Sequence, residues 1–155
     1  TRNHLICTFV KKNKSMNYFI RVFTIIILLF LVGCRQTNNN GIPYVQVNIK
    51  LYTTDPAFFN LNAVGGWEYI NGGSKGILVY RSGIDEFKAY DRHCPYQPSD
   101  ACSKVAVDSS NIMAVDTCCG SQFVITDGQV TKAPSVEPLK EYQTSYDGSI
   151  LIITN

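Results

Sequence analysis

The chain has 155 residues, with 14 basic and 12 acidic side chains and a formal net charge of +2. Five of the basic residues and none of the acidic ones lie in the first 33 positions, so the remaining residues carry nine basic against twelve acidic side chains, a net charge of −3. This part is long enough for one domain with its own core. Its mildly acidic character gives no electrostatic reason to expect nucleic-acid binding.

The segment before residue 34 is typical of a signal peptide. The first residue is Thr, and Met16 is the expected start of the translated chain. A basic segment precedes the apolar run VFTIIILLFLVG at 22–33. Twelve residues match the apolar region of a signal peptide and are fewer than the roughly 20 that span a bilayer. We therefore expect residues 1–33 to be upstream residues and a signal peptide, with an uncleaved anchor helix as the alternative.

The apolar run ends in Leu31-Val32-Gly33-Cys34, which resembles a bacterial lipobox. The resemblance implies cleavage before Cys34 and attachment of lipid to its thiol. A lipidated, N-acylated cysteine supplies the more than one acyl chain that stable anchoring needs. We expect a protein of the bacterial cell envelope that faces the periplasm and has the lipid membrane as a partner. Residues 34–43 are then the lipidated cysteine and a flexible polar tether.

Short strands are expected from residue 44 to residue 155. Residues 44–52, YVQVNIKLY, alternate apolar and polar side chains, which predicts a strand with one buried face. Six further strand segments follow: GILVYR (76–81), FKAYDR (87–92), NIMAVD (111–116), QFVIT (122–126), QVTKA (129–133) and SILIIT (149–154). Asp127-Gly128 and Asp147-Gly148 indicate hairpin turns. No long helical period appears after residue 50, so the prediction is an all-β domain of roughly eight to ten strands.

Four of the six cysteines form two clusters, at 94–102 and 118–119, separated by the apolar segment 111–116. Two cysteine loops joined through a strand indicate either a metal site or a disulfide clasp. An oxidising periplasm favours disulfides, and four cysteines permit three pairings. A bond between the neighbours Cys118 and Cys119 would close a strained ring. Two pairings therefore remain open.

The region from Val45 to Thr154 resembles a Rieske iron–sulfur domain. The resemblance rests on AYDRHCP at 89–95, on GSQF at 120–123, which is similar to the family's Gly-Ser-x-Phe, and on Asp127-Gly128 followed by Pro134 and Leu139. It implies a Rieske-like β sandwich with a small inserted β subdomain. The two cysteine loops, 94–104 and 116–121, would then lie side by side at the tip of that subdomain.

The resemblance places the cluster ligands on residues that depart from the family pattern. A Rieske domain holds a [2Fe–2S] cluster with Cys-x-His on one loop and Cys-x-x-His on the other. The corresponding positions are Cys94, Tyr96, Asp116 and Cys119, of which Cys94 alone keeps the ligand type. His93 precedes Cys94 and would point to the opposite face of an extended strand, so it is not expected to be a ligand.

The resemblance also implies a disulfide pairing. Some Rieske proteins tie the two loops with a disulfide whose second-loop cysteine directly precedes the ligand histidine, a position that Cys118 holds here. Its partner would be Cys102, which leaves Cys94 and Cys119 to form a second bridge where the cluster would lie. Each bridge is expected to stabilise the fold by about 2–4 kcal/mol.

Three functions follow as hypotheses. The favoured one is an exported, membrane-anchored structural or accessory module that is held by disulfides, has no cofactor and is not an enzyme. The first alternative is an electron-transfer protein with a [2Fe–2S] cluster of unusual ligands, working beside a redox or envelope protein partner. The second alternative is thiol–disulfide exchange or a single-metal site at Cys94, Asp116 and Cys119. The chain has no Gly-x-Ser-x-Gly elbow and no phosphate-binding loop in the required strand–turn–helix context.

Overall fold

The computed structural model of the protein describes residue 23 and residues 41–155. Apart from residue 23, the expected signal peptide lies outside the described residues, as do the lipidation site at Cys34 and most of the expected tether. Among the residues described, no helix combines the length and the apolar character needed to cross a membrane.

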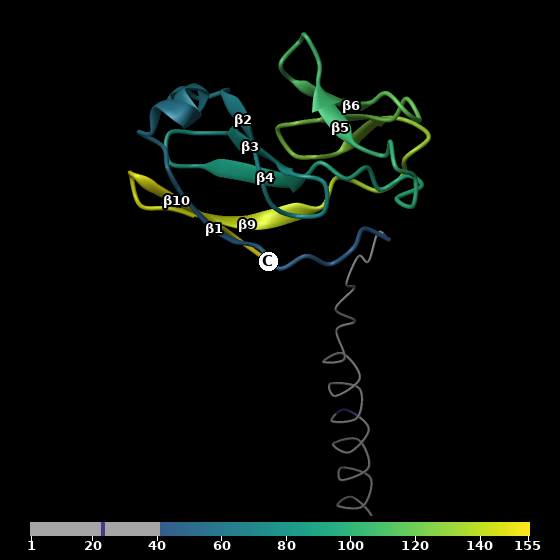
Figure 1. Cartoon of the computed structure of the whole chain (residues 1–155), viewed down its shortest axis with the longest axis horizontal. Coiled ribbons are helices and arrows are strands. Elements are labelled where there is room, and N and C mark those ends of the chain that lie inside the picture. Colours follow the sequence, from purple (N-terminus) through teal and green to yellow (C-terminus); the bar gives the residue numbers. More distant parts are fainter. Residues whose placement is uncertain (1–22, 24–40) are drawn as a thin grey trace, which may run out of the picture. The chain divides into compact units, whose positions relative to one another are not determined.

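Residues 41–155 contain two antiparallel sheets (Figure 1). The elements in chain order are β1 (Asn48–Tyr52), the 3-10 helix η1 (Pro56–Asn62), β2 (Trp67–Ile70), β3 (Ile77–Arg81), β4 (Phe87–Asp91), β5 (Val105–Val107), β6 (Met113–Asp116), β7 (Gln122–Val124), β8 (Val130–Lys132), β9 (Glu141–Tyr146) and β10 (Ile150–Thr154). The larger sheet has the strand order β1-β10-β9-β4-β3-β2, and the smaller has the order β5-β6-β7-β8. Strands β5 to β8 lie between β4 and β9 in the sequence, so the small sheet is an insertion. The prediction of an all-β fold with an inserted subdomain is confirmed.

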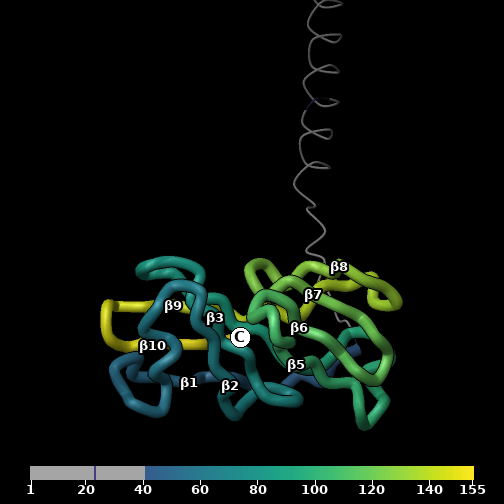
Figure 2. The backbone as a smooth tube through the Cα atoms, turned by 90° about the horizontal axis from the view of Figure 1, so that it is seen from above, coloured from purple at the N-terminus to yellow at the C-terminus, as the bar shows by residue number. Residues whose placement is uncertain are grey.

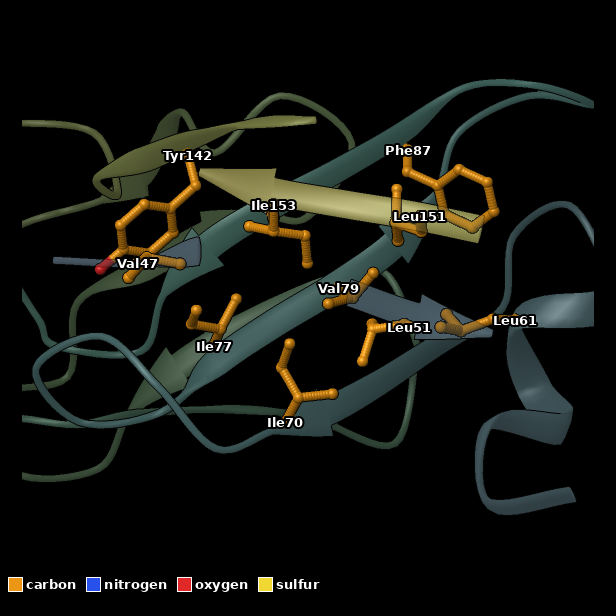
Figure 3. Close-up of a cluster of buried hydrophobic side chains, with 11 residues drawn as sticks. Val47, Leu51, Leu61, Ile70, Ile77, Val79, Phe87, Tyr142, Leu151 and Ile153 are labelled. Carbon is orange, nitrogen blue, oxygen red and sulfur yellow. The ribbon is translucent and has the colours of Figure 1, made fainter. Parts of the chain in front are cut away.

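The first hydrophobic core lies inside the six-stranded sheet (Figure 3). Ile77 and Val79 of β3 point into it from positions two apart, because alternate residues of a strand share a face. Leu51 and Ile70 come from β1 and β2, the two edge strands of the sheet, yet both belong to this same cluster. The sheet therefore curls until its two edges share one core.

The second core joins the two sheets, which lie beside each other in Figure 2. Leu78 and Tyr90 reach it from the opposite face of β3 and β4, while Ala114 and Phe123 reach it from β6 and β7. Strands β3 and β4 are thus buried on both faces. Cys94 belongs to this core as well and is fully buried. The packing fixes the inserted sheet against the end of β4, where the first cysteine loop begins.

Most predicted strands are present, and three strands were missed. The predicted segments between 76 and 92, between 111 and 133 and between 149 and 154 contain β3, β4, β6, β7, β8 and β10. The missed strands are β2, β5 and β9. Both hairpin predictions are confirmed, and Gly128 and Gly148 have positive φ values of 72° and 99° in these turns. The side chains of Asp127 and Asp147 each accept hydrogen bonds from the backbone of their turn.

Candidate functional site

The first cysteine loop, residues 94–104, is fastened by two side chains. Ser103 Oγ donates hydrogen bonds to the carbonyl oxygens of Cys94 and Tyr96, at 3.0 and 3.2 Å. Lys75 Nζ donates to three further carbonyl oxygens, those of Asp100, Ala101 and Ser103, at 2.8, 3.3 and 2.8 Å. Neither residue was singled out in the sequence. Lys75 is the one long side chain in the glycine-rich segment GGSKG, and this is the feature of the sequence that could have indicated its role. Nothing in the sequence distinguishes Ser103.

The second cysteine loop, residues 116–121, is a tight turn at the end of β6. The amide of Gly120 donates to the carbonyl oxygen of Asp116 at 2.7 Å, and Gly120 has a φ of +83°, which favours glycine. The amide of Cys118 donates to Asp116 Oδ1 at 2.8 Å. Cys119 Sγ donates to Ser121 Oγ at 3.1 Å. These contacts hold the thiol of Cys119 near the carboxylate of Asp116.

A disulfide bond between Cys102 and Cys118 joins the two loops, with Cα atoms 5.7 Å apart. This is the pairing that the resemblance implies, and it shows that the two loops lie side by side at the tip. The two residues are 16 positions apart in the sequence. Closing a loop of this length is worth about 3 kcal/mol through the lost freedom of the unfolded chain.

The second expected bridge is not formed, which corrects the pairing of Cys94 with Cys119. Both residues are free thiols, and their Sγ atoms lie 3.9 Å apart, whereas a disulfide requires about 2.05 Å. Burial, and after it the interaction with the carboxylate of Asp116, together raise the pKa of Cys94 to about 12. Cys94 is therefore a protonated thiol at neutral pH, and a thiol lacks the reactivity of a thiolate toward disulfide formation.

Cys94, Asp116 and Cys119 form a cluster that we call the Cys2Asp site. One ligand atom from each residue lies within 4.8 Å of those of the other two. Asp116 is fully buried, and its Oδ2 atom accepts no hydrogen bond from the described residues. A buried carboxylate oxygen without a donor is costly unless a cation or another partner satisfies it. The arrangement is therefore a candidate metal centre, built from three of the four positions identified in the sequence.

The fourth ligand position holds Tyr96, and the nearby His93 has no free ring nitrogen to offer the cluster. Tyr96 is partly buried and packs against the second core. His93 is 2% exposed, and both of its ring nitrogens are in hydrogen bonds, Nδ1 with Ser74 Oγ at 2.8 Å and Nε2 with the carbonyl oxygen of Pro98 at 2.7 Å. Burial lowers the pKa of His93. His93 thus holds the first loop in place, and neither of its ring nitrogens is free to bind a metal ion.

Comparison with protein-family models and with curated proteins gave no match. Among solved structures, the chain is similar to the plasma membrane Rieske protein PetC3 from Synechocystis PCC 6803, at 22% identity and a TM-score of 0.52. That match covers 69% of this chain and 99% of the other. It is also similar to the ferredoxin of carbazole 1,9a-dioxygenase from Nocardioides aromaticivorans IC177, at 15% identity and a TM-score of 0.45, over 72% of this chain and 98% of the other. The first match and the arrangement of the two sheets together show that the chain has a Rieske fold.

Proposed function

We propose that this protein is an exported, lipid-anchored accessory module of the bacterial cell envelope that holds one metal ion where Rieske proteins hold a [2Fe–2S] cluster. The observation that carries the proposal is the Cys2Asp site, in which the buried Asp116 Oδ2 has no hydrogen-bond partner among residues 41–155. The signal-peptide pattern and the lipobox-like sequence ending in Cys34 support export and anchoring. A binding role, with no catalytic step, is the function that these residues support best.

The residues present do not fit a regular Rieske cluster. Such a cluster takes two cysteine and two histidine ligands. Between residues 41 and 155, His93 is the one histidine, and both of its nitrogens are already bonded to the protein. Asp116 and Cys119 occupy the positions of a cluster cysteine and a cluster histidine. We therefore derive no electron-transfer step from the fold.

The spacing of the two sulfurs in the Cys2Asp site fits a single four-coordinate ion, and one carboxylate oxygen of Asp116 lies within 4.8 Å of both. Zinc binds cysteine sulfur at about 2.3 Å and carboxylate oxygen at about 2.0–2.2 Å. In a tetrahedral site these bond lengths place two sulfurs about 3.8 Å apart and a sulfur and an oxygen about 3.6 Å apart. The observed separation of the Sγ atoms of Cys94 and Cys119 is 3.9 Å. The two sulfurs are already at the spacing that one ion requires.

The donor set also indicates the class of metal. Thiolate ligands select zinc and other thiophilic ions over magnesium or calcium. Two thiolates and one carboxylate bring three negative charges into a buried place, so a divalent ion compensates them better than a monovalent one. Three protein ligands leave the fourth coordination position open to water or to a donor from another molecule. The protein contributes three ligands to the ion, of which Cys94 and Asp116 are buried and Cys119 is partly exposed.

Cobalt(II), which is coloured in thiolate sites, tests the metal-binding part of the proposal. The full chain, freed of metal by a chelator, should bind one Co²⁺ and develop the absorption bands of a four-coordinate cobalt thiolate. Cys119→Ser and Asp116→Asn should each weaken binding at least about tenfold, the usual loss for a disturbed site. The matched control is Asp85→Asn, because Asp85 is exposed and lies outside the cluster. Equal cobalt binding by all four proteins would contradict the site.

Mass spectrometry of the N-terminal peptide tests the anchor independently. Protein isolated from the native envelope should begin at Cys34 and carry lipid on that residue. Cys34→Ser should release the protein from the membrane fraction. A membrane-bound Cys34→Ser variant with residues 22–33 retained would instead show an uncleaved anchor.

A further inference from the structure

A pocket of about 590 Å³ lies against the first cysteine loop. Its lining includes the glycine-rich segment 71–76, Arg92 and, from the loop itself, Ala101 and Lys104. Pockets of this volume accommodate small ligands or the head of a larger one. None of its lining residues belongs to the Cys2Asp site.

Three of the eight basic residues between 41 and 155 line this pocket, namely Lys75, Arg92 and Lys104. None of them has a carboxylate partner, since Lys88 and Glu141 form the one ion pair among the described residues. Lys75 Nζ already donates to three carbonyl oxygens, so it contributes charge but no free donor. The pocket is therefore lined by basic side chains on a domain whose net charge is negative.

Asp91, the last residue of β4, is a buried carboxylate that the glycine-rich segment wraps. It accepts hydrogen bonds from the amides of Ser74, Lys75 and His93 and from the hydroxyl of Tyr142. Its side chain is fully buried, and these donors engage both of its oxygens. Asp91 therefore shapes the segment but offers no ion pair to Arg92 or Lys104.

Arg92 is held in place by its ring contact and by its Nε, and its terminal nitrogens have no partner in the part of the chain that the structure describes. Its guanidinium carbon lies 3.5 Å from the centroid of the Tyr69 ring, and its Nε donates to the carbonyl oxygen of Val105 at 3.0 Å. The two Nη atoms form no hydrogen bond with the described residues. A stacked, half-buried guanidinium with free Nη atoms is organised to bind a phosphate or carboxylate through two parallel hydrogen bonds. Burial lowers its pKa, as expected for a cation partly removed from water without an anion beside it.

The described domain begins against the first cysteine loop, which contributes Ala101 and Lys104 to this pocket. Gly41 lies against Pro98, because a methyl group on Gly41 would be 2.9 Å from Pro98 Cγ. Pro98 belongs to the same loop as Ala101 and Lys104. Cys34 precedes Gly41 by seven residues, a length of chain that spans at most about 25 Å. Lipid on Cys34 would therefore keep this part of the domain close to the headgroups of the membrane.

We infer that the pocket binds a phosphate group through Arg92 and Lys104, and that the phosphate belongs to an anionic phospholipid of the anchoring membrane. The choice of a lipid as the source rests on the anchor proposed above, whereas binding of the phosphate group does not. A phosphate headgroup bound here would add an electrostatic contact to the lipid on Cys34 and would orient the cysteine loops relative to the membrane.

The first arm of the test measures phosphate binding without a phospholipid. Inorganic phosphate is titrated into the full chain in a phosphate-free maltoside detergent, and backbone amide shifts are followed by NMR. Saturable shifts are expected at residues 72–76 and at Lys104. Lys104→Ala should weaken binding about tenfold or more, the effect of one charge-assisted hydrogen bond, and Arg92→Lys should also weaken it because the fork is lost. Lys132→Ala, a change of another exposed lysine, should leave binding unchanged. Absence of saturable shifts, or equal binding by Lys104→Ala and Lys132→Ala, would overturn the site.

The second arm identifies the source of the phosphate. The lipidated chain is placed in nanodiscs of a phosphate-free galactolipid, with or without phosphatidylglycerol. The same amides should shift when phosphatidylglycerol is present, and Lys104→Ala should abolish the shift. Shifts with inorganic phosphate but none with phosphatidylglycerol would overturn the lipid source. If Cys34 carries no lipid, the chain will not be tethered to the nanodisc while the first arm is unaffected, so failure of the anchor is distinguished from failure of the pocket.

Discussion

The Sγ atoms of Cys94 and Cys119 lie 3.9 Å apart, although the two residues are 25 positions apart in the sequence. The inserted sheet produces this closeness, because the chain leaves β4 at the first loop and returns through the turn after β6. The disulfide between Cys102 and Cys118 then joins the same two loops. The tip thus has one covalent cross-link and, next to it, two thiols and a carboxylate that remain available to a metal ion.

Removal of the disulfide should destabilise the domain. Replacing both Cys102 and Cys118 with Ser should lower the free energy of unfolding by about 2–4 kcal/mol, because the unfolded chain regains its freedom. Urea denaturation of the metal-free proteins measures the change. As an internal control, a reducing agent should lower the stability of the original chain and leave that of the double variant unchanged. Equal sensitivity of both proteins to the reducing agent would contradict the assigned bond.

The two free thiols should react at different rates. Cys94 is fully buried and its pKa is raised to about 12, whereas Cys119 is partly exposed. In the native, metal-free protein at pH 8, iodoacetamide should therefore modify Cys119 before Cys94, because the thiolate is the reactive form. Peptide mass spectrometry under non-reducing conditions gives the order and also detects any bond between the two. Faster modification of Cys94 would contradict the finding that this thiol is buried.

The hydrogen bonds of Asp91 should make a large contribution to stability. Asp91→Asn turns an amide group toward backbone donors in a buried place, so it should cost about 3 kcal/mol or more. Tyr142→Phe removes one of the donors, at 2.7 Å, and should cost about 1.5–3 kcal/mol. Asp85→Asn changes an exposed carboxylate and should stay within about 0.5 kcal/mol. Chemical denaturation compares the three, and a neutral Asp91→Asn would contradict the network.

The second core should depend strongly on Phe123. This side chain is fully buried where the small sheet meets β3 and β4, so Phe123→Ala should cost about 3–5 kcal/mol in free energy of unfolding. Val136 is 86% exposed, and Val136→Ala should change stability by less than about 0.5 kcal/mol. Thermal or urea unfolding of both variants provides the comparison. Similar stabilities would mean that the two sheets do not share this core.

The strands that were predictable are those with a strong apolar pattern. Residues 77–81 and 150–154 carry β-branched and apolar side chains in short runs, and both are strands. The strand β9, EYQTSY, reads as polar because Tyr142 is its one buried residue, and its place is set by pairing with β4 and β10. Residues 67–70 form a strand of four residues that follows a glycine pair, which made them look like part of a loop. Whether these segments form strands depends on pairing with other strands, and the local pattern of apolar residues carries no information about that pairing.

The positions of the residues of the Cys2Asp site were predictable from the sequence, but the state of its two thiols was not. The resemblance placed Cys94, Asp116 and Cys119 together, and the structure brings them within 4.8 Å of one another. The state of the two thiols depends on burial and on the turn around Ser121, which spacing along the chain does not determine. The loop contacts of Lys75 cross 25 to 28 positions of sequence, so they too become visible only in the folded chain.

Analysis of metal and acid-labile sulfide in protein purified from its native envelope tests the central claim most directly. The Cys2Asp site predicts about one thiophilic metal ion per chain, no labile sulfide, and loss of the ion in Asp116→Asn and Cys119→Ser. Two irons and two sulfides per chain, held by Cys94 and Cys119, would contradict a single-ion site and would show that this Rieske fold carries a cluster after all.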